Sequence, residues 1–155
     1  MCIVKLQDVR KDYPLGKTTV HALRGIDLKI NKGDFLSIVG PSGSGKTTLL
    51  NLIGCVDKAT DGELEIGGQR VSELSDNSLT DLRLFKIGFI FQSFNLIPVL
   101  NVLENVEFPL LLMKKYSREE IRERAEKVIE SVEITEQITQ KPTELSGGQR
   151  QRVAI

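Results

Sequence analysis

The feature that most constrains this chain is a glycine-rich segment, Gly40-Pro-Ser-Gly-Ser-Gly-Lys46-Thr47, which fits the pattern G-x-x-x-x-G-K-[ST]. Glycines allow a backbone to wrap around phosphate groups without Cβ clashes. The apolar run Phe35–Val39 predicts a strand buried on both faces before the loop. Helical spacing of apolar residues predicts a helix over Lys46–Ile53, closed by Gly54. A strand, such a loop and a helix in this order predict a site for a nucleoside triphosphate.

The residues of this loop have separate physical tasks. Backbone N–H groups and the positive end of the following helix attract a phosphate anion. The Lys46 ammonium suits the β- and γ-phosphate oxygens, and the hydroxyls of Thr47 and Thr48 suit Mg²⁺ and an α- or β-phosphate oxygen respectively. The residues expected to hold the phosphates are Gly40, Pro41, Ser42, Gly43, Ser44, Gly45, Lys46, Thr47 and Thr48.

The loop and the composition together exclude several classes of protein. The loop is not the G-x-G-x-x-G pattern, which excludes a dinucleotide-binding Rossmann site. Its 155 residues favour one domain, and 21 basic against 21 acidic residues argue against nucleic-acid binding. One histidine, His21, and two cysteines predict neither a metal cluster nor a disulfide framework, and Cys55 is expected to be a buried thiol. G proteins, kinases, helicases and transport ATPases all remain open.

No segment has the pattern of a signal peptide or a membrane span. Charged residues appear by Lys5, and the most apolar region, Phe94–Met113, is interrupted by Asn, Glu and Pro. We therefore expect a soluble chain whose membrane role, if it has one, comes through a partner.

The remaining elements are predicted from hydrophobic periodicity and from turn and cap signals. The first forty residues are expected to be β-rich and the chain to be helical from about residue 101. The predicted elements are strands over Ile3–Gln7, His21–Ile30 and Ile87–Phe91, a β-hairpin over Glu63–Val71, and helices over Ser75–Leu84, Ser117–Val132 and from near Ser146.

A second motif, Leu145-Ser-Gly-Gly-Gln149, lies where that last helix begins. Ser146 followed three residues later by Gln149 is a capping-box pattern, so an ordinary capped helix explains it. A hydroxyl, two glycine amides and a helix N-terminus would equally explain an anion site. Each alternative is physically sound when the motif is taken alone.

The two motifs together resemble the nucleotide-binding domain of ATP-binding cassette (ABC) proteins, whose signature is LSGGQ. The resemblance implies that Tyr13 stacks on adenine and that Gln92, with Thr47, coordinates Mg²⁺. It also implies a head-to-tail homodimer in which each signature contacts the partner's ATP, and an integral-membrane permease on the inner face of the cell membrane. The signature residues in question are Ser146, Gly147, Gly148 and Gln149.

The resemblance also implies a fold and a branch of the family. The expected fold is an α/β P-loop ABC ATPase with an N-terminal antiparallel β subdomain, a helical subdomain and an incomplete central sheet. Residues 1–155 are expected to be one partial domain, with the β-rich and P-loop part over about 1–92 and the helical subdomain over about 93–150. Segments 51–55, 81–83, 86–98 and 103–110 look like the lipoprotein-release, macrolide-export and antimicrobial-peptide-resistance branch.

One departure from the family bears on activity. Hydrolysis in ABC domains needs an apolar strand that ends in Asp-Glu after the signature helix. No such segment occurs in this sequence, so a C-terminally truncated domain is expected. The implied function is an ATP-binding subunit that powers a permease by ATP binding and hydrolysis. An ATP-binding-only module and a non-transport ABC-class protein are the alternatives, and the catalytic activity of this chain alone stays open.

Overall fold

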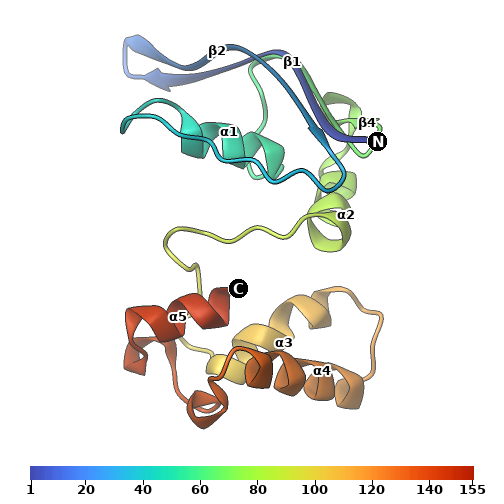
Figure 1. Cartoon of the computed structure of the whole chain (residues 1–155), viewed down its shortest axis with the longest axis vertical. Coiled ribbons are helices and arrows are strands. Elements are labelled where there is room, and N and C mark those ends of the chain that lie inside the picture. Colours follow the sequence, from blue (N-terminus) through green and yellow to red (C-terminus); the bar gives the residue numbers. More distant parts are fainter. The chain divides into compact units, whose positions relative to one another are not determined.

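Two long antiparallel strands, β1 (Cys2–Leu15) and β2 (Thr18–Asn31), open the chain in the computed structural model, which describes residues 1–155. β1 also pairs with β3 (Asp61–Ile66), and β3 pairs with β4 (Gln69–Arg70). The result is an antiparallel sheet in the order β2-β1-β3-β4, in which the two long strands β1 and β2 lie side by side (Figure 1). The predicted β-rich N-terminus and the predicted hairpin are therefore confirmed. Gly67 and Gly68 close that hairpin with φ of 57° and 82°, a geometry that favours glycine.

The chain divides into two compact units, Met1–Gly88 and Phe89–Ile155. In the first unit, α1 (Lys46–Ile53) and α2 (Asp76–Lys86) accompany the sheet, with a short 3-10 turn, η1, at Val71–Glu73. Alternate side chains of β1 and β3 point to one face and pack with the apolar faces of both helices. The buried side chains of this core are Val4, Leu6, Val9, Leu23, Leu49, Leu52, Cys55, Leu64, Ile66, Val71, Leu79 and Leu82.

Both helices of the first unit form where they were predicted, and Cys55 and His21 have the predicted surroundings. α1 has the predicted bounds, and α2 begins after Ser75, whose hydroxyl accepts a hydrogen bond from the backbone N–H of Ser78. Cys55 is buried as expected, and burial raises the pKa of its thiol. His21 lies on the edge strand β2, where its Nδ1 is 2.8 Å from an oxygen of Asp12.

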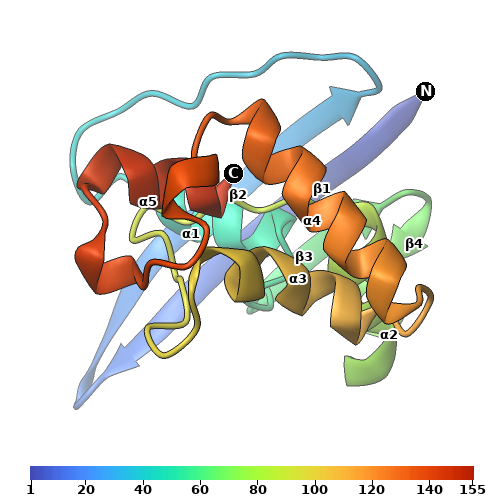
Figure 2. The same cartoon turned by 90° about the horizontal axis from the view of Figure 1, so that it is seen from below.

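The two strands predicted to be buried on both faces are not strands in the structure. Phe35–Val39 and Ile87–Phe91 have no regular secondary structure, and Figure 2 draws the segment between β2 and α1 as a tube. Phe35 is fully exposed, Val39 is 86% exposed and Ile90 is 59% exposed. A strand requires hydrogen-bonded neighbours, and none of the 155 residues pairs with either segment. The expectation of an incomplete central sheet is thus correct, whereas its two strands do not form.

The second unit is helical, with α3 (Val102–Leu112), α4 (Arg118–Ser131) and α5 (Gly147–Ala154). Two 3-10 turns, η2 (Thr135–Gln137) and η3 (Pro142–Glu144), lie between α4 and α5. Asn101, Ser117 and Ser146 each begin one of the three helices in a capping box, as the sequence predicts for the last two. α3 and α4 lie side by side over a shared apolar core. That core consists of Val102, Leu103, Ala125, Ile129, Ile134 and Leu145.

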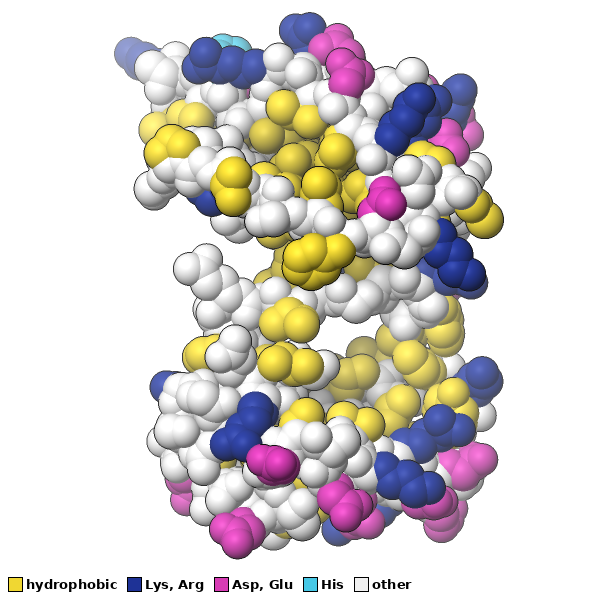
Figure 3. Space-filling view, in the orientation of Figure 1, with side chains coloured by type: hydrophobic (Ala, Val, Ile, Leu, Met, Phe, Trp, Pro, Cys, Tyr) yellow, Lys and Arg dark blue, Asp and Glu magenta, His cyan; other side chains and the backbone are white.

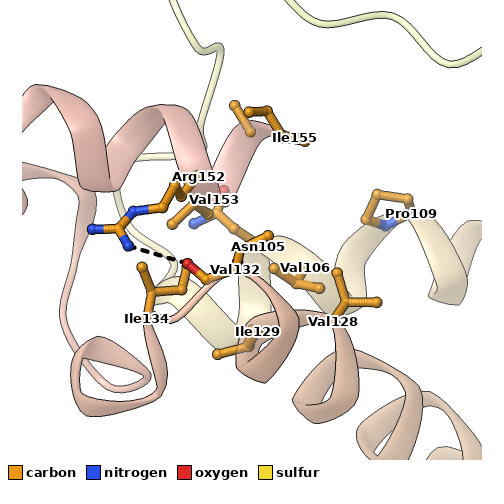
Figure 4. Close-up of a pocket in the computed structure, with 11 residues that line it drawn as sticks. Asn105, Val106, Pro109, Val128, Ile129, Val132, Ile134, Arg152, Val153 and Ile155 are labelled. Atoms are coloured by element: carbon orange, nitrogen blue, oxygen red, sulfur yellow. Dashed lines mark hydrogen bonds between the residues drawn. The ribbon is translucent and has the colours of Figure 1, made fainter.

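The apolar positions of α4 and its C-terminal cap, predicted to form one stripe, are Ile121, Ala125, Val128, Ile129 and Val132, and this stripe is only partly buried. Ile121, Ala125 and Ile129 are buried, but Val128 is 50% exposed. Val128 lines a hollow of about 190 Å³ with residues of α3 and α5 (Figure 4). At the edge of this hollow, Arg152 of α5 donates a hydrogen bond of 3.2 Å to the carbonyl oxygen of Val132, at the end of α4. This bond satisfies one of the carbonyl groups that a helix C-terminus leaves free.

Large apolar side chains reach solvent on both units, and the space-filling view shows them beside the charged side chains (Figure 3). On the first unit they include Phe35, Leu36, Val39, Leu50 and Phe85. Contiguous exposed apolar surface promotes association between molecules. No helix in the structure combines the length and the apolar character that crossing a bilayer requires.

We expect the purified 155-residue chain to self-associate, or to unfold over a broad temperature range. Sedimentation velocity and a circular-dichroism melt measure both properties. Replacing two exposed residues, Phe35→Ser with Val39→Ser, should reduce association and leave helical content unchanged. Leu52→Ser, which alters a fully buried side chain, should instead unfold the first unit. A sharp, reversible melt of a monomeric wild-type chain would contradict this expectation.

Candidate functional site

The phosphate loop joins α1 at Gly45, and the contact of this residue with the sheet requires glycine. Gly45 has φ 87°, in the left-handed region, and a Cβ built on it would lie 2.6 Å from the carbonyl oxygen of Ala22 on β2. Any side chain would therefore push the start of α1 away from β2. The close approach positions the N-terminus of α1 against the sheet.

That N-terminus is open. Gly45 offers no side chain to cap α1, and the first turn of α1 contains no acidic residue. The other four α-helices, α2 to α5, all begin with a serine or asparagine that accepts a hydrogen bond from the first turn. The first N–H groups of any helix have no partner within the helix and carry a partial positive charge. α1 is therefore the helix whose N-terminus remains available for an anion.

Lys46 lies folded across the loop. Its ammonium donates hydrogen bonds to the carbonyl oxygens of Gly40 and Pro41, at 2.8 and 2.7 Å, and lies 3.4 Å from the Ser44 hydroxyl. The cation is thus already held among the loop residues, and exposed carbonyl bonds of this kind are readily exchanged for stronger bonds to phosphate oxygens. Thr47 is exposed and Thr48 is half-buried, both in the first turn of α1.

Tyr13 lies near the end of β1 in the same unit. Its hydroxyl donates a 2.7 Å hydrogen bond to Asp57, and the Lys11 ammonium lies 4.8 Å from the centre of its ring. Partial burial, followed by the bond to Asp57, raises the pKa of the Tyr13 phenol, and the neighbouring Thr48 hydroxyl acts in the opposite direction. The structure therefore brings Tyr13 to the side of the first turn of α1, close to the predicted phosphate site.

The signature residues begin α5 in the second unit. The backbone N–H of Ser146 donates to the Gln149 side-chain oxygen at 2.8 Å, and the N–H of Gln149 donates to the Ser146 hydroxyl at 3.2 Å. The predicted capping box is confirmed. A Cβ on Gly147 or Gly148 would meet no atom within 4 Å, so nothing in this chain requires glycine at either position.

The structure does not gather a metal centre from side chains alone. No group of three or more His, Cys, Asp or Glu side chains is arranged to hold a metal ion. Gln92 is exposed in a turn of the second unit, whereas Thr47 belongs to the first. One hydroxyl and one amide oxygen suit Mg²⁺ only as a supplement to oxygens of a bound nucleotide. Their joint role in binding Mg²⁺ stays a prediction.

Two residues near Tyr13 were missed by sequence reasoning. Asp57 lies 44 residues beyond Tyr13, and the loop that contains it has no motif. Lys11 is two residues before Tyr13, but the spacing of residues along a strand does not predict that Lys11 pairs with Asp57. Only the fold brings the Lys11 ammonium to 2.7 Å from an Asp57 oxygen.

The chain is similar to known proteins along almost its whole length. Residues 23–155 match the sequence profile of the family described as ABC transporter. An uncharacterized ABC transporter ATP-binding protein of Methanocaldococcus jannaschii, MJ0796, is 49% identical over 99% of this chain. The macrolide export ATP-binding/permease protein MacB of Syntrophobacter fumaroxidans is 46% identical over 100% of this chain, which spans 22% of that protein.

A solved structure gives the same fold. It is a dimeric, post-hydrolysis state of the ATP-binding cassette MJ0796 bound to ADP and Pi, and it matches with a TM-score of 0.93 and 49% identity over 98% of this chain. The predicted fold class is confirmed. The match covers 67% of that solved chain, and this chain spans 66% of the length of the MJ0796 sequence.

The profile match, the sequence identity and the shared fold lead to one conclusion: the chain belongs to the ABC transporter family and has the fold of its ATP-binding domain.

Proposed function

We propose that this chain binds ATP, with the triphosphate held by the loop Gly40–Gly45 and by Lys46, Thr47 and Thr48. The observation that carries the proposal is the open N-terminus of α1, the one α-helix that begins without a capping side chain and directly follows a glycine-rich loop. The relative MJ0796 is described as bound to ADP and Pi in its solved structure, which supports a nucleotide at the corresponding place.

Each part of the site has a stated task in this proposal. The free N–H groups of the loop and of α1 donate to the phosphate oxygens, and the Lys46 ammonium exchanges its carbonyl partners for the β- and γ-phosphates. The ring of Tyr13 receives the adenine base by stacking. Thr47 and Gln92 would supply oxygen ligands to Mg²⁺, which when bound would neutralise negative charge on the phosphates.

The signature residues act, in this proposal, on a nucleotide held by a second copy of the chain. Glycine in the first turn of a helix costs stability relative to alanine, and neither Gly147 nor Gly148 is required by packing within the chain. Both glycines are explained if the nucleotide of a second copy approaches their backbone closely, since a side chain there would block it. Dimeric structures of MJ0796 support such an arrangement of two copies.

The same proposal gives the chain a place in a transporter. Relatives such as MacB are described as ATP-binding/permease proteins, so we propose an integral-membrane permease as the partner and the inner face of the cell membrane as the location. The 155 residues contain no Asp-Glu dipeptide, which the water-activating step of this family requires. We therefore propose that this chain, as it stands, binds ATP without turning it over.

The first test is Lys46→Ala, measured by isothermal titration calorimetry with ATP. Loss of charge-assisted hydrogen bonds to phosphate should weaken binding by about 10- to 100-fold. Lys127→Ala removes the same charge from an exposed ion pair with Glu123 on α4 and should leave the dissociation constant unchanged. Equal affinity of the Lys46→Ala variant and the wild type would refute the proposed site.

The second test is release of inorganic phosphate from ATP. The wild-type chain and the Lys46→Ala variant should both release phosphate at the background rate, because the 155 residues lack the Asp-Glu segment from which the family activates water. Steady turnover that is lost in Lys46→Ala would show that another residue of this chain activates the water molecule.

The third test compares two glycine substitutions by helical content and by resistance to thermolysin. Gly148→Ala should leave the chain intact or stabilise α5 by up to about 1 kcal/mol, since alanine is the better helix former. Gly45→Ala should destabilise the first unit, because its Cβ would overlap the Ala22 carbonyl oxygen. Unfolding caused by Gly148→Ala would remove the argument that this glycine serves a partner.

A further inference from the structure

Asp57 is the centre of a hydrogen-bond network beside Tyr13. Its carboxylate accepts from the Lys11 ammonium and from the Tyr13 hydroxyl, both at 2.7 Å, and from the backbone N–H of Lys58 at 2.7 Å. Both carboxylate oxygens are therefore engaged, and the Tyr13 hydroxyl has a defined direction. Hydrogen bonds to an ionised acceptor are shorter and stronger than neutral ones.

The network is held in place by its surroundings. The Lys11 side chain is only 12% exposed, and its ammonium also donates to the carbonyl oxygen of Lys58 at 2.7 Å. Thr60 ties the same loop to β1 twice: its N–H donates to the Arg10 carbonyl oxygen at 2.9 Å, and its hydroxyl accepts from the N–H of Asp12 at 3.0 Å. The loop from Asp57 to Thr60 cannot shift along β1 without breaking several of these bonds.

The loop is also attached to the phosphate-binding helix. The N–H groups of Val56 and Asp57 both donate to the carbonyl oxygen of Asn51 in α1, at 2.9 and 3.2 Å. One end of α1 is thus open to an anion, and its other end positions the carboxylate that holds Tyr13. The loop that contains Asp57 and the glycine-rich loop are therefore attached to opposite ends of the same helix.

We propose that Asp57, together with Lys11, is a positioning residue that holds the Tyr13 ring in the orientation in which it receives the purine base of the nucleotide. The Lys11 ammonium lies over the Tyr13 ring, 4.8 Å from the ring centre, and Tyr13 remains 36% exposed. The Lys11 ammonium covers one face of the Tyr13 ring, and in this proposal the base stacks on the opposite face. This inference rests on the proposed binding of ATP and adds two residues, Lys11 and Asp57, to the proposed base-binding part of the site.

The energetic consequence concerns the base and not the phosphates. A ring that is already ordered loses less side-chain freedom when the base arrives, so the bond to Asp57 should strengthen binding of any ligand that has a base. Ordering one such side chain corresponds to roughly a three- to tenfold change in affinity. A ligand that consists of phosphates alone should not sense the orientation of Tyr13.

The test measures dissociation constants for ATP and for inorganic tripolyphosphate by titration calorimetry on the 155-residue chain. The variants are Asp57→Asn, which keeps the shape of the side chain, and Tyr13→Phe, which keeps the ring but removes its hydroxyl. Each should weaken ATP binding by roughly three- to tenfold and leave tripolyphosphate binding unchanged. Asp57→Asn combined with Tyr13→Phe should be little weaker than Tyr13→Phe alone, because both variants act on the same hydrogen bond: Tyr13→Phe removes it, and Asp57→Asn makes its acceptor neutral and the bond weaker.

Asp76→Asn is the matched control. Asp76 is 89% exposed and pairs with Lys58 at 2.8 Å, so the change removes the same charge close by without touching Tyr13. It should alter neither dissociation constant. If Asp57→Asn unfolds the chain, the Tyr13→Phe variant tests the same bond with a smaller change.

Three results would overturn the inference, and they can be told apart. Equal weakening of ATP and tripolyphosphate by Asp57→Asn would indicate general disruption of the site. Unchanged ATP affinity in both single variants, with weaker ATP binding in Tyr13→Ala, would retain the stacking and reject the role of Asp57. Failure of the wild type to bind either ligand would reject the proposed function together with the inference.

Discussion

The contact between the start of α1 and strand β2 is the constraint on which the candidate site depends. A Cβ built on Gly45 would lie only 2.6 Å from the carbonyl oxygen of Ala22 on β2, so only glycine allows this close approach. The same residue leaves the helix without a capping side chain. One substitution-intolerant position therefore both fixes the helix on the sheet and leaves its positive end free for an anion.

The two glycine-rich helix starts of this chain differ in a way that matters for their use. At α1 the first N–H groups are free, and glycine is required by the fold of the chain itself. At α5 the capping box between Ser146 and Gln149 satisfies part of the helix end, and a Cβ added at Gly147 or Gly148 would meet no atom within 4 Å. The first arrangement suits a ligand held by this chain, and the second suits a surface that something else approaches.

Local patterns predicted well those elements that are stabilised locally. Capping-box patterns predicted the starts of α4 and α5, and two adjacent glycines predicted the hairpin between β3 and β4. Phe35–Val39 and Ile87–Phe91 have equally clear apolar patterns, yet neither forms a strand. A helix makes its backbone hydrogen bonds within itself, whereas a strand depends on neighbours that are distant in sequence.

The sequence by itself determined which residues are proposed to bind phosphate, because the prediction for Gly40–Thr48 rests on residue type and spacing along one short segment. Only the tertiary structure decided which polar groups surround Tyr13. Lys11, Tyr13 and Asp57 meet because β1 runs beside the loop that follows α1, and their contacts span up to 46 residues. Hydrophobic periodicity does not predict these contacts, because the packing of separate elements, and not their local sequence, decides which polar groups become hydrogen-bond partners.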